Sequence, residues 1–220
     1  GIGRTAMISH SKKCIFLHIP KTGGYVIKDI MKEHSQDKLT KGHPSLIGPT
    51  AGWRMFPERG YWSDQVAGLM HPKLAFYYQF YNPQLVEEYC KFTVVRNPWE
   101  RLVSYASYIN GGAFDYEILK SIVYFPEKNI GPGEVTQLQY LKDPSGDVNV
   151  DRVVRQENFT EEMQKLFVDL DIPFEEGIFS KKKNTTEHQS YVDYYKEDEK
   201  KAIANICAEE IDLFKYEYGK

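Results

Sequence analysis

CIFLHIPKTGGY, residues 14–25, is the stretch of this chain that decides its fold. Residues 14–19 form a continuous apolar run of strand length, as expected of a strand that is buried on both faces. A Pro/Gly turn follows, and the next segment places apolar residues at helical spacing: Val26, Ile27, Ile30 and Met31. Strand, loop and helix in this order form the repeating unit of a parallel sheet covered by helices.

The same alternation continues along the chain and sets the fold class. Residues 92–95 read as a second buried strand, and residues 150–154 are a third strand candidate. A helix after Arg96 carries its own start signals, with Asn97 at the N-cap, Pro98 at the first helical position and Glu100 near the capping-box position. Other helices are expected over 72–81, 114–124, 133–142 and 159–170, with a long final helix carrying Ile203, Ile206, Cys207, Ile211 and Phe214. We therefore expect an α/β, P-loop-like three-layer fold whose central, mostly parallel sheet is flanked by helices.

Length and composition bound the domain organisation and exclude some functions. The chain has 220 residues and a formal net charge of −3, so it lacks the basic excess of a general nucleic-acid binder. No run approaches the ~18 apolar residues that a membrane-spanning helix needs. We expect a single domain over residues 1–220, with 1–12 as leader or added residues and 35–70 as an irregular insertion near the ligand. Nothing in the sequence indicates the oligomeric state.

The three cysteines, Cys14, Cys90 and Cys207, lack the paired spacing of a zinc site or a redox dithiol. We interpret them as free thiols in apolar surroundings. An odd number cannot close a disulfide framework, which favours a reducing, cytoplasmic compartment over a truncated lumenal domain.

The loop after the first strand is a candidate anion site. Its glycines, Gly23 and Gly24, allow backbone amides to approach an anion, and the following helix adds the partial positive charge of its N-terminus. Lys21 and the Thr22 hydroxyl supply the cation and the donor that a phosphate or sulfate site needs. The alternative is a turn whose glycines serve only to reverse the chain.

A second candidate anion site follows the strand at 92–95. Arg96 leaves the end of that strand, and Ser104 lies about two turns along the next helix, on the same face as Arg101 and Tyr108. An arginine fork with a hydroxyl suits a phosphate monoester. Taken singly, Arg96 could equally pair with a surface carboxylate, and Ser104 could be a tolerated helix residue.

Together and in this order, the two segments resemble the sulfotransferase superfamily that uses 3'-phosphoadenosine 5'-phosphosulfate (PAPS). Residues 21–24 are similar to the family's 5'-phosphosulfate loop, and Arg96 with Ser104 matches its 3'-phosphate pair. The resemblance is to the carbohydrate branch, which includes the uronyl 2-O- and chondroitin sulfotransferases. Further similar segments are 18–23, 96–98, 100–104, 137–141, 156–159, 184–186, 190–191, 194–195 and 212–216. Residues 35–70 are the part without a counterpart.

The resemblance implies a reaction and a set of roles. The family passes a sulfuryl group from PAPS to an acceptor hydroxyl or amine, in line and without a metal, and releases 3'-phosphoadenosine 5'-phosphate (PAP). Lys21 would stabilise charge on the oxygen that bridges sulfur and the departing phosphate. The 5'-phosphate would be held by Thr22, Gly23, Gly24 and Tyr25, and a basic loop near the nucleotide's 3'-phosphate would contribute Lys183 and Asn184.

A general base must accept the proton of the acceptor hydroxyl. His71 is our choice, because it precedes a helix shortly before the Arg96 strand, where the carbohydrate branch carries its catalytic histidine. His43 is the reserve. His18, inside the first strand segment, is expected to be packed or directed away from the ligand. The alternative for His71 is a helix-capping or merely exposed residue.

The acceptor is expected to be a saccharide or a small molecule, and residues 35–70 would lie on the acceptor side. Trp53, Tyr61 and Trp62 could stack on sugar rings or other flat acceptors, or be core residues. Two other functions compete. A P-loop kinase shares the strand, loop and helix, but the chain lacks the Gly-x-x-x-x-Gly-Lys-[Ser/Thr] motif. A carbohydrate-binding relative with a dead sulfotransferase fold is the non-enzymatic alternative.

Overall fold

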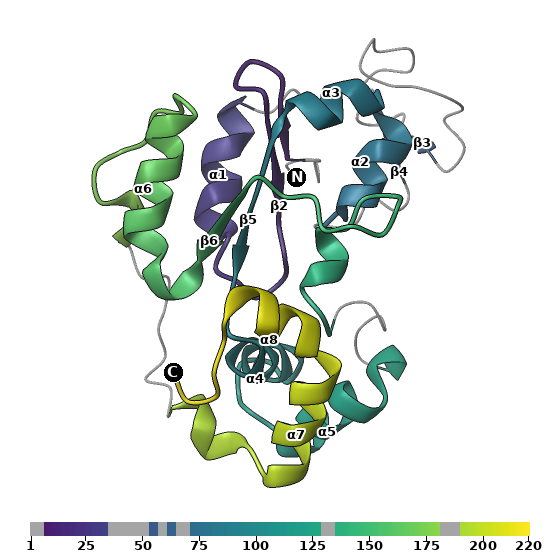
Figure 1. Cartoon of the computed structure of the whole chain (residues 1–220), viewed down its shortest axis with the longest axis vertical. Coiled ribbons are helices and arrows are strands. Elements are labelled where there is room, and N and C mark those ends of the chain that lie inside the picture. The colour runs from purple at the N-terminus through teal and green to yellow at the C-terminus, as the bar shows by residue number, and fades with distance from the viewer. Residues whose placement is uncertain (1–6, 35–52, 57–60, 65–70, 129–134, 181–189) are drawn as a thin grey trace. The chain divides into compact units, whose positions relative to one another are not determined.

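A computed structural model of the chain describes residues 7–34, 53–56, 61–64, 71–128, 135–180 and 190–220 (Figure 1). The chain divides into two compact units. The first unit comprises residues 1–94 and 140–180, and the second comprises residues 95–139 and 181–220. The expectation of one domain over residues 1–220 stays a prediction.

A four-stranded sheet forms the centre of the first unit. Its strand order is β1 (Ile8–Ser9), β2 (Cys14–Leu17), β5 (Cys90–Val95) and β6 (Arg152–Arg155). Strands β1 and β2 are antiparallel, whereas β2 and β5 are parallel, with Cys14 opposite Cys90 and Leu17 opposite Thr93. Every residue of β2 is buried, which explains the apolar run that predicts it. The predicted strands and the mixed, mostly parallel sheet are therefore confirmed.

Helices cover the sheet of the first unit. In Figure 1, α1 (Tyr25–His34) and α6 (Phe159–Asp169) lie to one side of β2 and β5, and α2 (Leu74–Phe80) and α3 (Pro83–Glu88) lie to the other. The core between α1, α6 and the strands includes Phe16, Ile27, Met31, Phe92, Met163 and Phe167. The helical spacings at 26–31 and 159–170 thus mark the faces that bury these side chains. The α/β fold class with flanking helices is confirmed.

The segment expected to be an irregular insertion contains regular structure. Strands β3 (Trp53–Phe56) and β4 (Tyr61–Asp64) form an antiparallel hairpin in which Trp53 is opposite Asp64. The rest of the segment lies outside the described residues. The backbone of Trp53, Tyr61 and Trp62 belongs to this hairpin, so the expectation of irregular structure is wrong for these eight residues.

The second unit is helical in the part of the chain that the structure describes. Helices α4 (Pro98–Ile109), α5 (Tyr116–Tyr124), α7 (Glu197–Ile206) and α8 (Ala208–Phe214) share a core that includes Trp99, Leu102, Ile122, Ile203 and Cys207. The N-cap prediction for α4 is confirmed, because the Asn97 side chain accepts hydrogen bonds from the amides of Trp99 and Glu100. The Glu100 side chain pairs with Arg96 at 3.3 Å.

Two helix predictions in this unit and its flank are wrong. The expected long final helix breaks at Cys207, whose φ of −99° and ψ of 19° end α7 and start α8. Apolar spacing continues across the break because both helices bury side chains in the same core. The expected helix at 133–142 is replaced, within its described residues, by a single 3-10 turn at Leu138–Tyr140. Gln137, just before that turn, is fully buried, and its main-chain amide donates a hydrogen bond to Glu210. Glu210 lies far away in the chain, so no local sequence pattern encodes this contact.

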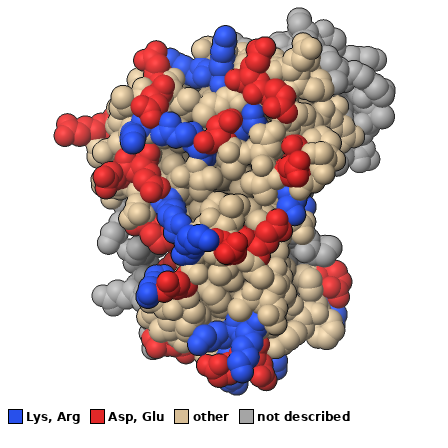
Figure 2. All heavy atoms as spheres, in the orientation of Figure 1, with Lys and Arg blue, Asp and Glu red and all other residues tan. Residues whose placement is uncertain are grey.

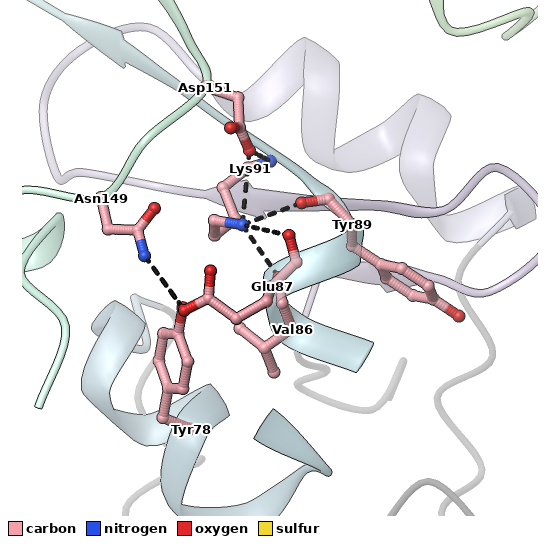
Figure 3. Close-up of polar contacts among 7 residues, drawn as sticks. All are labelled: Tyr78, Val86, Glu87, Tyr89, Lys91, Asn149 and Asp151. Atoms are coloured by element: carbon pink, nitrogen blue, oxygen red, sulfur yellow. Dashed lines mark hydrogen bonds and ion pairs between the residues drawn. The ribbon is translucent and has the colours of Figure 1, made fainter. Parts of the chain in front are cut away.

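Lys91 is a buried cation that joins three elements of the first unit (Figure 3). Its ammonium donates to the carbonyl oxygens of Val86 at 2.8 Å and Tyr89 at 3.0 Å, which lie at the C-terminal end of α3. It also lies 3.4 Å from the Asp151 carboxylate, just before β6. A cation at this position satisfies the carbonyl groups that a helix end leaves without partners. Lys91 thereby fixes α3 and β6 to β5.

The cysteines are free thiols, as expected. The sheet brings Cys14 directly opposite Cys90, however, although they lie far apart in the chain. Burial raises the pKa of Cys14 to about 12, so its thiol stays protonated. Among the residues described, none of the helices has the length and apolar character needed to cross a membrane.

Candidate functional site

The loop between β2 and α1 has an unusual backbone. Lys21 has a φ of 64° and Gly23 a φ of 84°, so both lie in the left-handed region. Glycine adopts this conformation readily, whereas Lys21 does so at a cost in free energy. The turn leads directly into α1 at Tyr25. The first amides of a helix have no intrahelical partner, so this loop presents backbone donors at a partially positive helix end.

Thr22 closes the loop from within. Its side chain is fully buried, and its hydroxyl donates to the carbonyl oxygen of Ile19 at 2.8 Å. The proton of this hydroxyl is therefore used inside the loop and is not directed at a ligand. Thr22 fixes the path of the backbone on which Gly23 and Gly24 lie.

Gly24 makes room for the side chains beneath the loop. A Cβ atom at this position would lie 2.7 Å from Cδ2 of His18, 2.8 Å from its Nε2 and 2.9 Å from Cζ of Phe16. Such distances are well inside van der Waals contact, so any larger residue would displace these rings. Gly24 is needed here for close packing, in addition to any approach of the backbone to an anion.

His71 bonds to the end of β2. Its Nδ1 lies 2.9 Å from the carbonyl oxygen of His18, one residue beyond the strand. A carbonyl oxygen only accepts hydrogen bonds, so Nδ1 carries the proton and the neutral ring keeps its lone pair on Nε2. The structure therefore brings the predicted base into the same unit as the Lys21 loop. His18 itself is buried and packed, as expected.

Arg96 follows β5, and Gln137 holds its main chain. The Arg96 amide donates to the Gln137 side-chain oxygen at 2.9 Å, and the Gln137 side-chain nitrogen donates to the Arg96 carbonyl at 2.7 Å. The main-chain amide and the side-chain nitrogen of Gln137 both donate to the Glu210 carboxylate. Burial raises the pKa of Glu210. The guanidinium of Arg96 pairs with Glu100, which agrees with the alternative of a carboxylate partner.

Ser104 lies in the second turn of α4 and is half-buried. Ser104 was expected to lie on the same face of the helix as Arg101 and Tyr108, but these two residues differ strongly in their exposure to solvent. Arg101 is fully buried and donates to the Val135 carbonyl at 3.0 Å, whereas Tyr108 is 61% exposed. Arg101 is thus a structural residue of the second unit's core, and Ser104 lies at the boundary between that core and solvent.

The sequence motifs assign no role to Glu210, and they include Gln137 and Gln156 only within segments that are similar to the family. Gln156 follows β6, and its side-chain nitrogen would lie 3.4 Å from a Cβ atom placed on Gly23. No local signal predicts contacts over such separations in the chain. The predicted residues His43, Lys183 and Asn184 lie outside the described residues.

Acidic and basic side chains of the described residues are interspersed on the face drawn in Figure 2. On that face neither sign forms a continuous stripe. This distribution agrees with a net charge of −3 and with anion recognition by a few placed cations.

Comparison with known proteins gives one match. Residues 4–111 match the model of the sulfotransferase family, which is just under half of the chain. The search of curated proteins and the search of solved structures each find no match to the chain. The matched region contains the Lys21 loop, His71, Arg96 and Ser104, and it ends just after α4. Over residues 4–111 the chain is therefore similar to the sulfotransferase family.

Proposed function

We propose that this chain is a PAPS-dependent sulfotransferase that transfers the sulfuryl group to a hydroxyl of a saccharide or small molecule, without a metal. One observation carries the proposal. The hydrogen bond from His71 to the His18 carbonyl joins a candidate base to the strand whose end forms the Lys21 loop. The match of residues 4–111 to the sulfotransferase family supports it independently.

The Lys21 loop would hold the 5'-phosphosulfate of the donor. The left-handed backbone at Lys21 and Gly23 turns the chain so that successive amides lead into α1. Amides of Gly23, Gly24 and Tyr25 would bind the phosphate, and the Lys21 ammonium would neutralise charge that develops on the bridging oxygen. Because Thr22 uses its hydroxyl inside the loop, only its amide would remain as a donor.

Arg96 and Ser104 would bind the 3'-phosphate. Gln137 fixes the main chain of Arg96, which reduces the freedom that binding would otherwise remove. Charge-assisted hydrogen bonds from a guanidinium are strong and geometrically specific for phosphate oxygens. Lys183 and Asn184 remain predicted contacts of the same nucleotide end.

His71 would act as the general base. With Nδ1 held by the His18 carbonyl, Nε2 can accept the proton of the acceptor hydroxyl. PAPS supplies the sulfuryl group: the acceptor oxygen bonds to sulfur, the bond from sulfur to the bridging oxygen breaks, and PAP leaves with that oxygen. Transfer of this kind depends on positioning and charge stabilisation.

Calorimetry with PAP tests the nucleotide site. We expect the wild-type chain to bind PAP more tightly than adenosine 5'-monophosphate, because the latter lacks the 3'-phosphate. Arg96→Ala should weaken PAP binding by about 10- to 100-fold and should abolish most of the preference for PAP. Lys120→Ala is the matched control and should bind PAP as the wild type does; Lys120 is a partly exposed lysine of α5 that pairs with Glu117. If the wild type does not bind PAP, the proposal fails and a dead relative becomes the better interpretation.

An acceptor screen tests the reaction. The chain is incubated with sulfur-labelled PAPS and a set of uronic-acid saccharides, hexosamine saccharides and phenols. We expect label to enter at least one hydroxyl acceptor, and Lys21→Ala and His71→Ala to lose this transfer while remaining folded. Retained transfer by folded Lys21→Ala would remove its assigned role. ATP consumption that requires magnesium, without sulfate transfer, would replace the proposal by a kinase.

A further inference from the structure

The ring of His18 lies in a closely packed position beneath the Lys21 loop. It is 2% exposed, stacks on Phe16 with centroids 5.2 Å apart, and contacts the Tyr25 ring edge-on at 5.5 Å. Tyr25 is the first residue of α1. The ring of His18 is therefore fixed between β2 and the start of the helix that follows the loop.

The same ring contacts both the loop and the candidate base. On one side lies Gly24, where a Cβ atom would be within 2.7–2.8 Å of the ring. On another side lies His71, with ring centroids 4.4 Å apart and an angle of 59° between the rings. The His18 main chain also accepts the hydrogen bond from His71 Nδ1. One residue thus contacts His71 through both its carbonyl and its side chain.

The His18 ring is uncharged at neutral pH. Its burial lowers its pKa well below the usual value, and the nearby His71 and Lys28 lower it further. Among the residues described, its Nδ1 atom is buried without a hydrogen-bond partner. A buried polar atom without a hydrogen-bond partner lowers the stability of the fold. Hydrogen bonding by this nitrogen therefore does not explain why a histidine occupies position 18.

We propose that His18 is a positioning residue for sulfuryl transfer, whose packed ring holds its own carbonyl and the His71 ring so that His71 keeps its proton on Nδ1 and its lone pair on Nε2. The inference rests on the proposed function in one respect, the role of His71 as base. The positioning acts through shape: the ring fills the space that Gly24 leaves, and His71 packs against its other side.

Long-range 1H–15N correlation spectra of the imidazole rings test the proposal directly, because they report which nitrogen of each histidine carries the proton. In the wild type we expect His71 to be protonated on Nδ1 at about pH 8, where a neutral ring predominates. His18→Ala removes the ring and should let His71 move, so that the Nδ1–H form falls to about half or less of the population. His18→Phe keeps a ring of similar shape and should preserve the Nδ1–H form of His71.

Two controls separate positioning from stability. His10→Phe removes another histidine of the first unit, whose Nδ1 bonds the Tyr89 hydroxyl at 2.8 Å, and should leave the His71 tautomer unchanged. His18→Phe should be at least as stable as the wild type, because it deletes the buried nitrogen that lacks a partner among the described residues. It therefore gives a folded variant even if His18→Ala unfolds.

The outcomes also separate this inference from the proposed function. PAP binding by the wild type decides the proposed function and does not depend on the tautomer of His71. A wild-type His71 that carries its proton on Nε2, an unchanged tautomer in folded His18→Ala, or loss of the Nδ1–H form in His18→Phe would each overturn the positioning role. Retention of the Nδ1–H form of His71 in His18→Phe, together with its loss in His18→Ala, would establish the positioning role.

Discussion

The carboxylate of Glu210 accepts two hydrogen bonds from Gln137, one from its main-chain amide at 2.8 Å and one from its side-chain nitrogen at 2.6 Å. Glu210 is 1% exposed and Gln137 is fully buried. The side chain of Gln137 also bonds both main-chain polar groups of Arg96. A single amide side chain thus connects α8 with the residue that follows β5.

Gln137→Ala should therefore affect stability and nucleotide binding together. It leaves the Glu210 carboxylate without the bond from the Gln137 side chain and frees the Arg96 main chain, and we expect a loss of about 2–4 kcal/mol in the free energy of unfolding. PAP binding should weaken, because Arg96 loses its support. Urea unfolding and calorimetry measure the two effects. Gln139→Ala, an exposed glutamine two residues away, is the control; equal stability of both variants would contradict the role of Gln137.

A second prediction concerns Lys91 (Figure 3). Lys91→Met keeps an unbranched side chain that is one atom shorter and leaves the carbonyls of Val86 and Tyr89 without their cation. Because these groups are buried at a helix end, we expect a loss of about 2–4 kcal/mol in the free energy of unfolding. Urea unfolding of Lys165→Met, an exposed lysine of α6, gives the reference value for removing a surface charge. A loss no larger than that of the reference would mean that the buried cation adds nothing.

Local signals in the sequence predicted the elements that build the sheet and the start of α4. The apolar run at 14–19, which contains β2, the helical spacing of α1 and the Asn97 cap each depend on a few neighbouring residues. The break at Cys207 and the loss of the expected helix at 133–142 were not predictable in this way. They depend on packing and hydrogen bonds between residues far apart in the chain, such as those of Gln137 and Glu210.

In the candidate site, too, local sequence signals predict some features, whereas others depend on packing between elements. The residue types of the Lys21 loop and of His71 are enough to predict anion binding and proton transfer. They do not indicate that Thr22 uses its hydroxyl inside the loop or that Gly24 lies against the His18 ring. Both facts follow from the way β2 and α1 pack, which a motif does not specify.

Gly24→Ala tests the close packing beneath the loop. The added methyl group would lie 2.7–2.9 Å from the His18 and Phe16 rings, so we expect overpacking to lower the free energy of unfolding by about 1–3 kcal/mol. The shift of His18 should also weaken PAP binding. Gly111→Ala meets nothing within 4 Å and should show only the strain of its positive φ, with unchanged PAP binding. If Gly24→Ala bound PAP as tightly as Gly111→Ala, the loop would not depend on this contact.

The buried His18 ring predicts how stability depends on pH. Its pKa in the folded chain lies well below 6.5, chiefly because of burial, whereas the unfolded chain has an ordinary histidine. As pH falls below about 6.5, the unfolded chain therefore takes up a proton that the folded chain does not. The free energy of unfolding should fall by up to about 1.4 kcal/mol per pH unit from this residue alone.

The difference between the wild type and His18→Phe isolates this contribution. Urea unfolding at intervals between about pH 8 and pH 5 should give a constant difference above about pH 7.5, where both states of His18 are neutral. Below about pH 6.5 the wild type should lose stability relative to the variant. A difference that stays constant down to the lowest pH would mean that folded His18 takes up a proton as readily as the unfolded chain, which would contradict the neutral ring.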